Sequence, residues 1–305
     1  MVVEKSGSIK YLLGIDGGGT KTEFILTDLE FNEINRTVLD ASNPVNLGLE
    51  NTFNILENGI SDVCRDIDKK EISVFAGLAG GISPDNKRTI RDFLAKYGFG
   101  AYGNGGDTDN VIKMALEDDD GVAVIMGTGI IAFSVCNGVR HRIGGWGYLI
   151  DKGASGFSYG SDALENALRC ADGRGGSELI LRLVEEKLGA PVTECISEIY
   201  SGGAAFIASF APLVFEAYVM GDLQAQFIID RNTRYAAEMI YAGLKLHNGR
   251  KVKTVICGGL CSQKEIIEQF LIKHLGKENK IKFMEKPPVC GALALAKSIA
   301  ENTEA

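Results

Sequence analysis

Apolar and polar positions along the first third of the chain alternate between a strand-like and a helix-like period. Short apolar runs predict strands, and apolar residues at three- and four-residue spacing predict helices. In chain order, the expected elements are strands 10–16, 21–28 and 33–40, helix 47–60, strand 71–77, helix 85–97, strand 100–104 and helix 109–117. Strands mixed with helices in this way are typical of an α/β domain.

The same order of strand, glycine turn and strand begins again after residue 118. Apolar strand 122–126 leads through a turn into strand 130–136, and an Asn137-Gly138 hairpin turn leads into strand 139–143. Helices 155–170, 176–188, 193–200, 204–220 and 222–247 follow, then strand 252–257, helix 263–275, strand 280–284 and helix 288–300. The repeat predicts an internal duplication with two lobes, 1–118 joined by the C-terminal helix 287–305, and 119–286.

Each half carries a glycine-rich turn between two strands. The turns are Asp16-Gly17-Gly18-Gly19-Thr20-Lys21 and Gly127-Thr128-Gly129. Glycines allow backbone N–H groups to approach an anion closely. Because each turn leads into a strand and not a helix, neither a Walker A loop nor a dinucleotide fingerprint fits. The two turns therefore predict phosphate-binding hairpins that hold opposite ends of one polyphosphate.

Composition narrows the class of partner. The 305 residues carry a net charge of -8, which argues against a nucleic acid or an anionic membrane as partner. Seven widely spaced cysteines form no paired framework and are expected to be reduced thiols. No apolar core of signal-peptide length lies in residues 1–10, and run 204–220 is broken by Ser209, Pro212 and Glu216, as expected for a buried helix. We expect a cytoplasmic protein that binds a small molecule.

Several motifs together resemble the N-acetylglucosamine kinase and BadF/BadG/BcrA/BcrD ATPase family of the sugar kinase/Hsp70/actin superfamily. They are the two glycine turns, Cys257-Gly258-Gly259-Leu260, Gly221-Asp222, Gly144-Gly145-Trp146-Gly147 and Ser42-Asn43. The resemblance implies a two-lobed, actin-like (ribonuclease H-like) α/β fold and an ATP-dependent kinase that acts on an amino sugar. It also implies ATP and Mg²⁺ as cofactors, and it leaves a homodimer open.

The resemblance also implies roles for individual residues. Asp16 would orient Mg²⁺. The implied ATP-binding residues are Gly17, Gly18, Gly19, Thr20, Lys21, Gly127, Thr128, Gly129, Gly221, Gly258 and Gly259. The implied sugar-binding residues are Asn43, Gly80, Gly145, Trp146, and either Asp151 or Lys152. Lys21 could equally be a solvated strand residue, and Asn43 a plain turn residue.

Asp109 is the expected general base. It opens the helix predicted after Gly105-Gly106-Asp107-Thr108, where the family places its catalytic Asp. A carboxylate there can accept the proton of a sugar hydroxyl as the oxygen attacks the γ-phosphate. We rank Asp109 ahead of Asp107, and an acid in the first turn would also favour the helix dipole.

Two departures from the family pattern concern the sugar. Ile130 and Ile131 follow the second turn where family members have polar residues, and an ungapped match puts Lys152 in the place of a sugar-binding Asp. Asp151 takes that place after a one-residue slip. We therefore expect N-acetylglucosamine, glucosamine or N-acetylmuramic acid as substrate, with Lys152 opposite the lactyl carboxylate of the last.

Two rival functions remain open at this point. A redox-activator ATPase would hold an iron–sulfur cluster with cysteines beside glycines, which Cys136 and Cys170 match poorly. A sugar-binding regulator without catalysis would tolerate the two isoleucines and Lys152. The zinc signature of the related bacterial repressor/ORF/kinase group is absent, and His141, His247 and His274 have no metal-ligand spacing.

Overall fold

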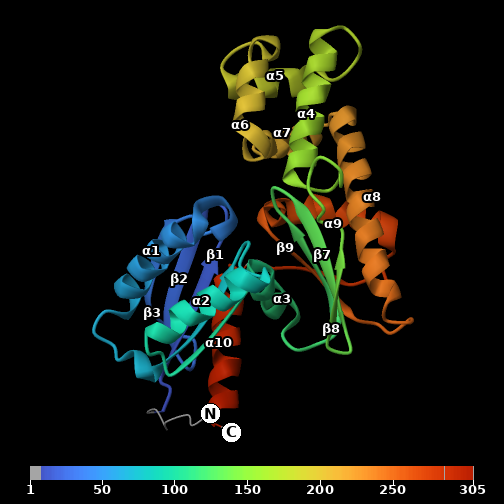
Figure 1. The fold of residues 1–305 in the computed structure, drawn as a ribbon. Coiled ribbons are helices and arrows are strands. Elements are labelled where there is room, and N and C mark those ends of the chain that lie inside the picture. Colours follow the sequence, from blue (N-terminus) through green and yellow to red (C-terminus); the bar gives the residue numbers. More distant parts are fainter. Residues whose placement is uncertain (1–7, 285, 305) are drawn as a thin grey trace. The chain divides into compact units, whose positions relative to one another are not determined.

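The computed structural model describes residues 8–284 and 286–304 (Figure 1). The chain divides into two compact units, one of residues 1–118 and 286–305 and the other of residues 119–285. Each unit contains one five-stranded sheet with helices packed against it. The fold is therefore α/β, as predicted.

The sheet of the first unit has the strand order β3-β2-β1-β4-β5. Strands β1, β2 and β3 are antiparallel and joined by short turns, whereas β4 and β5 run parallel to β1 and are reached through helices. The strands are β1 (Tyr11–Gly17), β2 (Lys21–Asp28), β3 (Glu33–Asp40), β4 (Ile72–Leu78) and β5 (Ala101–Gly105).

Helices cover both faces of this sheet. Leu13, Ile15 and Phe24 pack with the helices α1 and α2 on one face, and the alternate residues Leu12 and Ile25 pack with α10 on the other. The helices of this unit are α1 (Pro44–Cys64), α2 (Pro84–Lys96), α3 (Asp107–Leu116) and α10 (Val289–Glu304). The C-terminal helix is thus part of the first unit.

Helices α3 and α10 cross at very close range. A Cβ built on Gly291 of α10 would lie 1.8 Å from the carbonyl oxygen of Asn110 in α3, so only glycine fits there. This crossing fixes the position of Asn110, which is fully buried.

The second sheet repeats the first, with the order β10-β9-β6-β7-β8. Its first three strands are again antiparallel, and the last two again lie parallel on the other side of the first. The strands are β6 (Gly121–Met126), β7 (Ile130–Cys136), β8 (Val139–Ile143), β9 (Lys253–Cys257) and β10 (Ile281–Phe283). The shared strand order confirms the predicted duplication.

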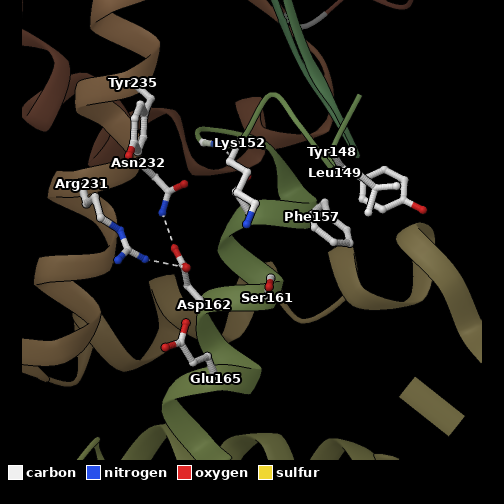
Figure 2. Close-up of a pocket in the computed structure, with 12 residues that line it drawn as sticks. Tyr148, Leu149, Lys152, Phe157, Ser161, Asp162, Glu165, Arg231, Asn232 and Tyr235 are labelled. Carbon is white, nitrogen blue, oxygen red and sulfur yellow. Dashed lines mark hydrogen bonds and ion pairs between the residues drawn. The ribbon is translucent and has the colours of Figure 1, made fainter. Parts of the chain in front are cut away.

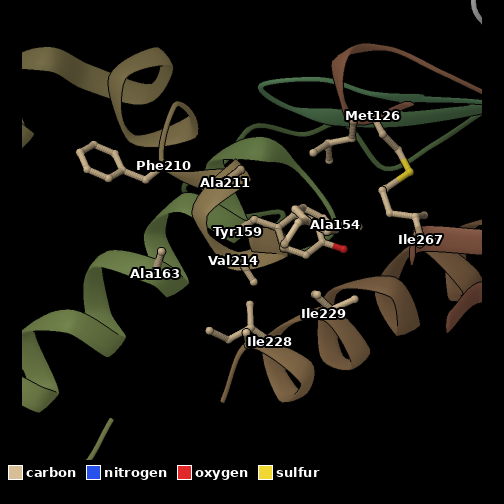
Figure 3. Close-up of a cluster of buried hydrophobic side chains, with 14 of the residues drawn as sticks. Met126, Ala154, Tyr159, Ala163, Phe210, Ala211, Val214, Ile228, Ile229 and Ile267 are labelled. Atoms are coloured by element: carbon tan, nitrogen blue, oxygen red, sulfur yellow. The ribbon is translucent and has the colours of Figure 1, made fainter. Parts of the chain in front are cut away.

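Six α-helices complete the described part of the second unit. They are α4 (Gly156–Ala171), α5 (Glu178–Leu188), α6 (Ile196–Ala208), α7 (Ala211–Val219), α8 (Leu223–Lys245) and α9 (Lys264–Leu275). Short 3₁₀ helices occur at η1 (Lys69–Glu71) in the first unit and at η2 (Val192–Glu194) and η3 (Gly259–Gln263) in the second. Figure 3 shows part of the core of the second unit around Tyr159 of α4. The Tyr159 ring also packs against Phe215 of α7, with 4.9 Å between the ring centroids.

The prediction of a single helix over 204–220 is wrong. The chain turns between α6 and α7, which are bent by 64°. Pro212 lies in the first turn of α7, where its missing N–H is tolerated but would interrupt a continuous helix. Among the residues that the structure describes, no single helix is long and apolar enough to cross a bilayer, and α6 with α7 meets that test only as a bent pair.

Candidate functional site

The first glycine turn joins β1 to β2 and is held by backbone hydrogen bonds. Gly18 N–H donates to the Lys21 carbonyl at 2.9 Å, and the Gly17 and Gly18 carbonyls accept from Ala79 and Ser42 at 2.7 and 3.3 Å. The tip, by contrast, is exposed at Gly19 and Thr20. The turn is therefore anchored at its base and open at its tip.

Asp16 lies at the base of this turn beside a buried amide. Its Oδ1 accepts a 2.7 Å hydrogen bond from Nδ2 of Asn110. Burial raises the pKa of Asp16 to about 6, the Asn110 hydrogen bond opposes that rise, and the charges of Asp107 and Glu23 add to it. The pKa of Asp16 is thus close to neutral pH, and a nearby cation would stabilise its charged form.

The start of α3 differs from the prediction. The helix begins at Asp107, with Gly106 as its N-cap, and not at Asp109. The Oδ2 atom of Asp109 accepts from Gly106 N–H at 2.7 Å, so this carboxylate caps the helix. Asp107 accepts from Thr108 N–H at 2.9 Å, and burial raises its pKa. Of the two acids, Asp107 is the one whose charge acts on Asp16.

Lys21 is exposed and lies in an ionic network. Its Nζ is 3.5 Å from Oε2 of Glu23, which is buried and also pairs with Arg36. A phosphate at Lys21 would therefore compete with Glu23 for the ammonium.

Asn43 and Gly80 are brought together in the first unit. Asn43 caps α1 by accepting from Val45 N–H at 2.9 Å. A Cβ built on Gly80, whose φ is 73°, would lie 2.5 Å from Oδ1 of Asn43. The cap uses the Asn43 oxygen, whereas the Nδ2 atom carries the amide donors.

The second glycine turn is docked on the start of α4. Gly156 and Phe157 N–H groups donate to the carbonyls of Gly127 and Thr128 at 2.7 and 3.0 Å. As in the first turn, backbone bonds fix the base while Thr128 and Gly129 are exposed.

Gly258 lies directly against this second turn. Strands β6 and β9 are parallel neighbours, so their carboxyl ends meet. A Cβ on Gly258, with φ of 103°, would lie 2.5 Å from the Met126 carbonyl oxygen. Gly259 begins η3 beside it, whereas Gly221 lies in the α7–α8 connection, where Asp222 caps α8. Gly258 and Gly259 therefore lie beside the second glycine turn.

The Gly-Gly-Trp-Gly segment forms an exposed loop after β8. Trp146 is 62% exposed, and the Arg142 guanidinium lies 4.1 Å from the centroid of its ring. Asp151 accepts from Trp146 N–H at 3.1 Å and so closes the loop. A Cβ on Gly145 would lie 2.7 Å from Ile131, which packs against the loop, and Ile130 is buried in the core.

Lys152 lines a pocket of about 390 Å³ between this loop, α4 and α8 (Figure 2). Asp162 on the pocket wall is paired with Arg231 at 2.6 Å and accepts from Nδ2 of Asn232 at 2.7 Å. Figure 2 shows the Lys152 side chain extending into the pocket. The remaining lining residues are Tyr148, Leu149, Gly153, Phe157, Ser158, Ser161, Glu165 and Tyr235.

Sequence reasoning missed Asn110. Its amide contacts Asp16 and also lies near the backbone carbonyls of Ile15 and Gly77, at 3.3 and 3.4 Å. The one feature of the sequence that could have indicated Asn110 is that this polar residue directly precedes the apolar residues Val111 and Ile112.

Comparisons with known proteins agree over nearly the whole chain. The model of the BadF/BadG/BcrA/BcrD ATPase family matches residues 13–296. An N-acetylmuramic acid/N-acetylglucosamine kinase of Clostridium acetobutylicum is 27% identical over 95% of this chain and 99% of its own length. An N-acetyl-D-glucosamine kinase of Dictyostelium discoideum is 27% identical over 88% of this chain and 91% of its own length.

Solved structures show the same fold. A provisionally assigned N-acetylglucosamine kinase from Chromobacterium violaceum superposes with a TM-score of 0.76, at 23% identity, over 95% of this chain and 100% of its own. A ROK family glucokinase from Streptomyces griseus, solved with glucose and AMPPNP, has a TM-score of 0.62 at 14% identity. The match covers 95% of this chain and 99% of the glucokinase chain.

Proposed function

The chain belongs to the BadF/BadG/BcrA/BcrD ATPase family, and we propose that it is an ATP-dependent kinase of an amino sugar. Its substrate is N-acetylglucosamine, N-acetylmuramic acid or glucosamine. The names of the two relatives support the first two sugars. The observation that carries the proposal is the group of Asp16, Asn110 and Asp107 at the base of an anchored glycine turn.

The nucleotide phosphates are assigned to the two glycine turns. Both turns are fixed at the base and exposed at the tip, which suits backbone and threonine donors for phosphate oxygens. Gly258 and Gly259, packed beside the second turn, are assigned to the adenosine end. Gly221 and Lys21 are assigned to ATP through the resemblance alone.

Asp16 is the residue that would hold Mg²⁺. Its carboxylate oxygens are the hard donors this ion prefers, and burial together with the nearby charges of Asp107 and Glu23 raises its pKa, so a cation would stabilise the charged form. When bound, the ion neutralises charge on the phosphates. Asn110 fixes the orientation of the Asp16 carboxylate.

Asp107 is supported over Asp109 as the general base. The Asp109 carboxylate caps α3, whereas the charge of Asp107 raises the pKa of Asp16 and burial raises the pKa of Asp107 itself. A sugar hydroxyl donates its proton to Asp107 as its oxygen attacks the γ-phosphorus in line. The bond from that phosphorus to the bridging oxygen breaks, and ADP leaves.

Through the resemblance, sugar contacts are assigned to Asn43 and Gly80 in the first unit and to Gly145, Trp146 and Lys152 in the second. Asp151 is given a supporting role, because its carboxylate holds the Trp146 loop. The Lys152 ammonium, which reaches into the pocket, is the counter-charge for the carboxylate of N-acetylmuramic acid.

The proposal is tested by measuring ADP release with N-acetylglucosamine, N-acetylmuramic acid, glucosamine and glucose, each against a reaction without sugar. We expect ADP release that depends on an amino sugar. Hydrolysis independent of sugar would instead indicate a redox-activator type of ATPase. Calorimetric binding of a sugar without turnover would indicate a regulator.

A further inference from the structure

Three side chains of different types meet at one end of the second sheet. Asp120 immediately precedes β6, Cys136 ends β7 and His247 follows α8. Their ligand atoms, a carboxylate oxygen, the thiol sulfur and an imidazole nitrogen, all lie within 4.8 Å of one another. The kinase proposal gives these residues no role.

The hydrogen bonds of His247 determine which ring nitrogen carries its proton. The imidazole is fully buried, and Nε2 lies 3.0 Å from Oγ of Ser134. That hydroxyl donates its one hydrogen to the Gly243 carbonyl at 3.1 Å, so it accepts from Nε2–H. The Nδ1 atom therefore carries a lone pair.

This Nδ1 lone pair is buried and has no hydrogen-bond partner. Leaving a buried polar atom without a partner is destabilising, so a ligand that satisfied it would stabilise the fold. A neutral imidazole whose other nitrogen donates to a fixed acceptor is the arrangement found in metal-binding histidines.

A positive group already lies beside the other two ligands. Nη2 of Arg250 is 3.0 Å from Oδ2 of Asp120 and 3.4 Å from Sγ of Cys136. The Arg250 side chain is 52% exposed, so it can move into solvent. The other Asp120 oxygen accepts from Asn137 N–H at 2.8 Å, which orients the carboxylate.

We propose that Asp120, Cys136 and His247 form a zinc site, completed by water, from which the metal displaces Arg250. Thiolate and imidazole donors select a borderline-soft ion such as Zn²⁺ over Mg²⁺ or Ca²⁺. Binding releases the Cys136 thiol proton to solvent and leaves a Zn–S bond. The ion ties the start of β6 and the end of β7 to the segment after α8.

This site is distinct from the proposed nucleotide site. The second glycine turn follows the last residue of β6 and precedes the first of β7, whereas Asp120 and Cys136 lie at the other ends of the same strands. A strand of six residues spans about 20 Å. The inference therefore concerns stability and does not depend on the proposed function.

The test uses the full chain, stripped of metal with a chelator and free of ATP and sugar. We expect one equivalent of Co²⁺ to bind with a sulfur-to-cobalt charge-transfer band, Zn²⁺ to displace it, and Zn²⁺ to raise the melting temperature. Cys136→Ser should abolish the band, whereas Cys170→Ser, which alters another partly buried thiol of the same unit, should keep it. Absence of the band in the wild-type chain would overturn the proposal, as would its persistence in Cys136→Ser.

Arg250→Gln is a second test that does not depend on replacing a buried residue, because it changes an exposed side chain. The guanidinium competes with the ion, so this variant should bind Co²⁺ at least threefold more tightly. Unchanged or weaker binding would contradict the displacement. Asp16→Asn should keep the cobalt band, and its loss there would assign the signal to the kinase site and overturn the zinc site.

Discussion

Asn110 of α3 donates a hydrogen bond of 2.7 Å to the carboxylate of Asp16, a residue 94 positions earlier in the chain. Two opposing effects meet at this contact. Burial favours the protonated acid, and the amide favours the carboxylate. The outcome is a pKa of about 6, so burial disfavours the charged form that Asp16 takes at neutral pH.

Replacing Asp16 with Asn is expected to stabilise the metal-free chain while removing turnover. The Asp16 pKa rises from 3.8 to about 6 on folding, so the folded state binds the proton more tightly. Wild-type stability therefore falls as the pH rises through that window. In urea unfolding, the free energy of unfolding of Asp16→Asn should exceed that of the wild type by about 1–3 kcal/mol at pH near 7.5, and the difference should vanish at pH near 3, below the unfolded-state pKa.

The matched control is Asp92→Asn, an exposed carboxylate of α2, which should show no such pH-dependent gain. A lower stability of Asp16→Asn at pH near 7.5 would contradict the explanation by burial.

Replacing Asn110 with Ala should move the pH dependence of turnover. Loss of the hydrogen bond removes the contribution that lowers the Asp16 pKa, so the acidic limb of kcat should shift upward by several tenths of a pH unit. Asn104→Ala removes an amide that donates to the Lys87 carbonyl and should leave the limb in place. If Asn110→Ala lowers the melting temperature but leaves the acidic limb of the kcat–pH profile unchanged, Asn110 contributes only to packing.

The two acids of α3 are distinguished by a pair of substitutions. Asp107→Asn should lower kcat by about 10²–10⁴-fold, because it removes the proposed base. Asp109→Asn should leave kcat within a few-fold and cost on the order of 1 kcal/mol of stability, because it weakens the cap on Gly106. Steady-state kinetics and urea unfolding measure both, and the reverse pattern would restore Asp109 as the base.

Lys152 is expected to govern which amino sugar is preferred. Lys152→Met should raise KM for N-acetylmuramic acid about tenfold and leave KM for N-acetylglucosamine nearly unchanged, since only the former carries a carboxylate. Lys251→Met, which removes an exposed lysine elsewhere in the same unit, is the control. Equal losses for both sugars would show that Lys152 does not contact the lactyl group.

Much of the fold was predictable because its signals are local. The apolar strands that flank each glycine turn and the Asn137-Gly138 hairpin turn all depend on neighbouring residues. The cap at Asp222, the first residue of predicted helix 222–247, is equally local. Errors arose where two local signals compete, as at Pro212 inside an apolar run and at Gly106, which caps α3 two residues earlier than expected.

The site was less predictable because its contacts join distant segments. Asn110 reaches Asp16 only through the packing of α3 near β1 and α10. Cys136 and His247 approach each other only because α8 packs across β7. Sequence spacing carries no information on such pairs.

The central claim is that this chain transfers the γ-phosphoryl group of ATP to an amino sugar. The most direct test is to measure the mass of the sugar after incubation with Mg·ATP, using Asp107→Asn as the control variant. With the wild-type chain we expect a product heavier than N-acetylglucosamine or N-acetylmuramic acid by one phosphoryl group, and with Asp107→Asn much less of that product. Release of ADP and inorganic phosphate with no phosphorylated sugar would contradict it.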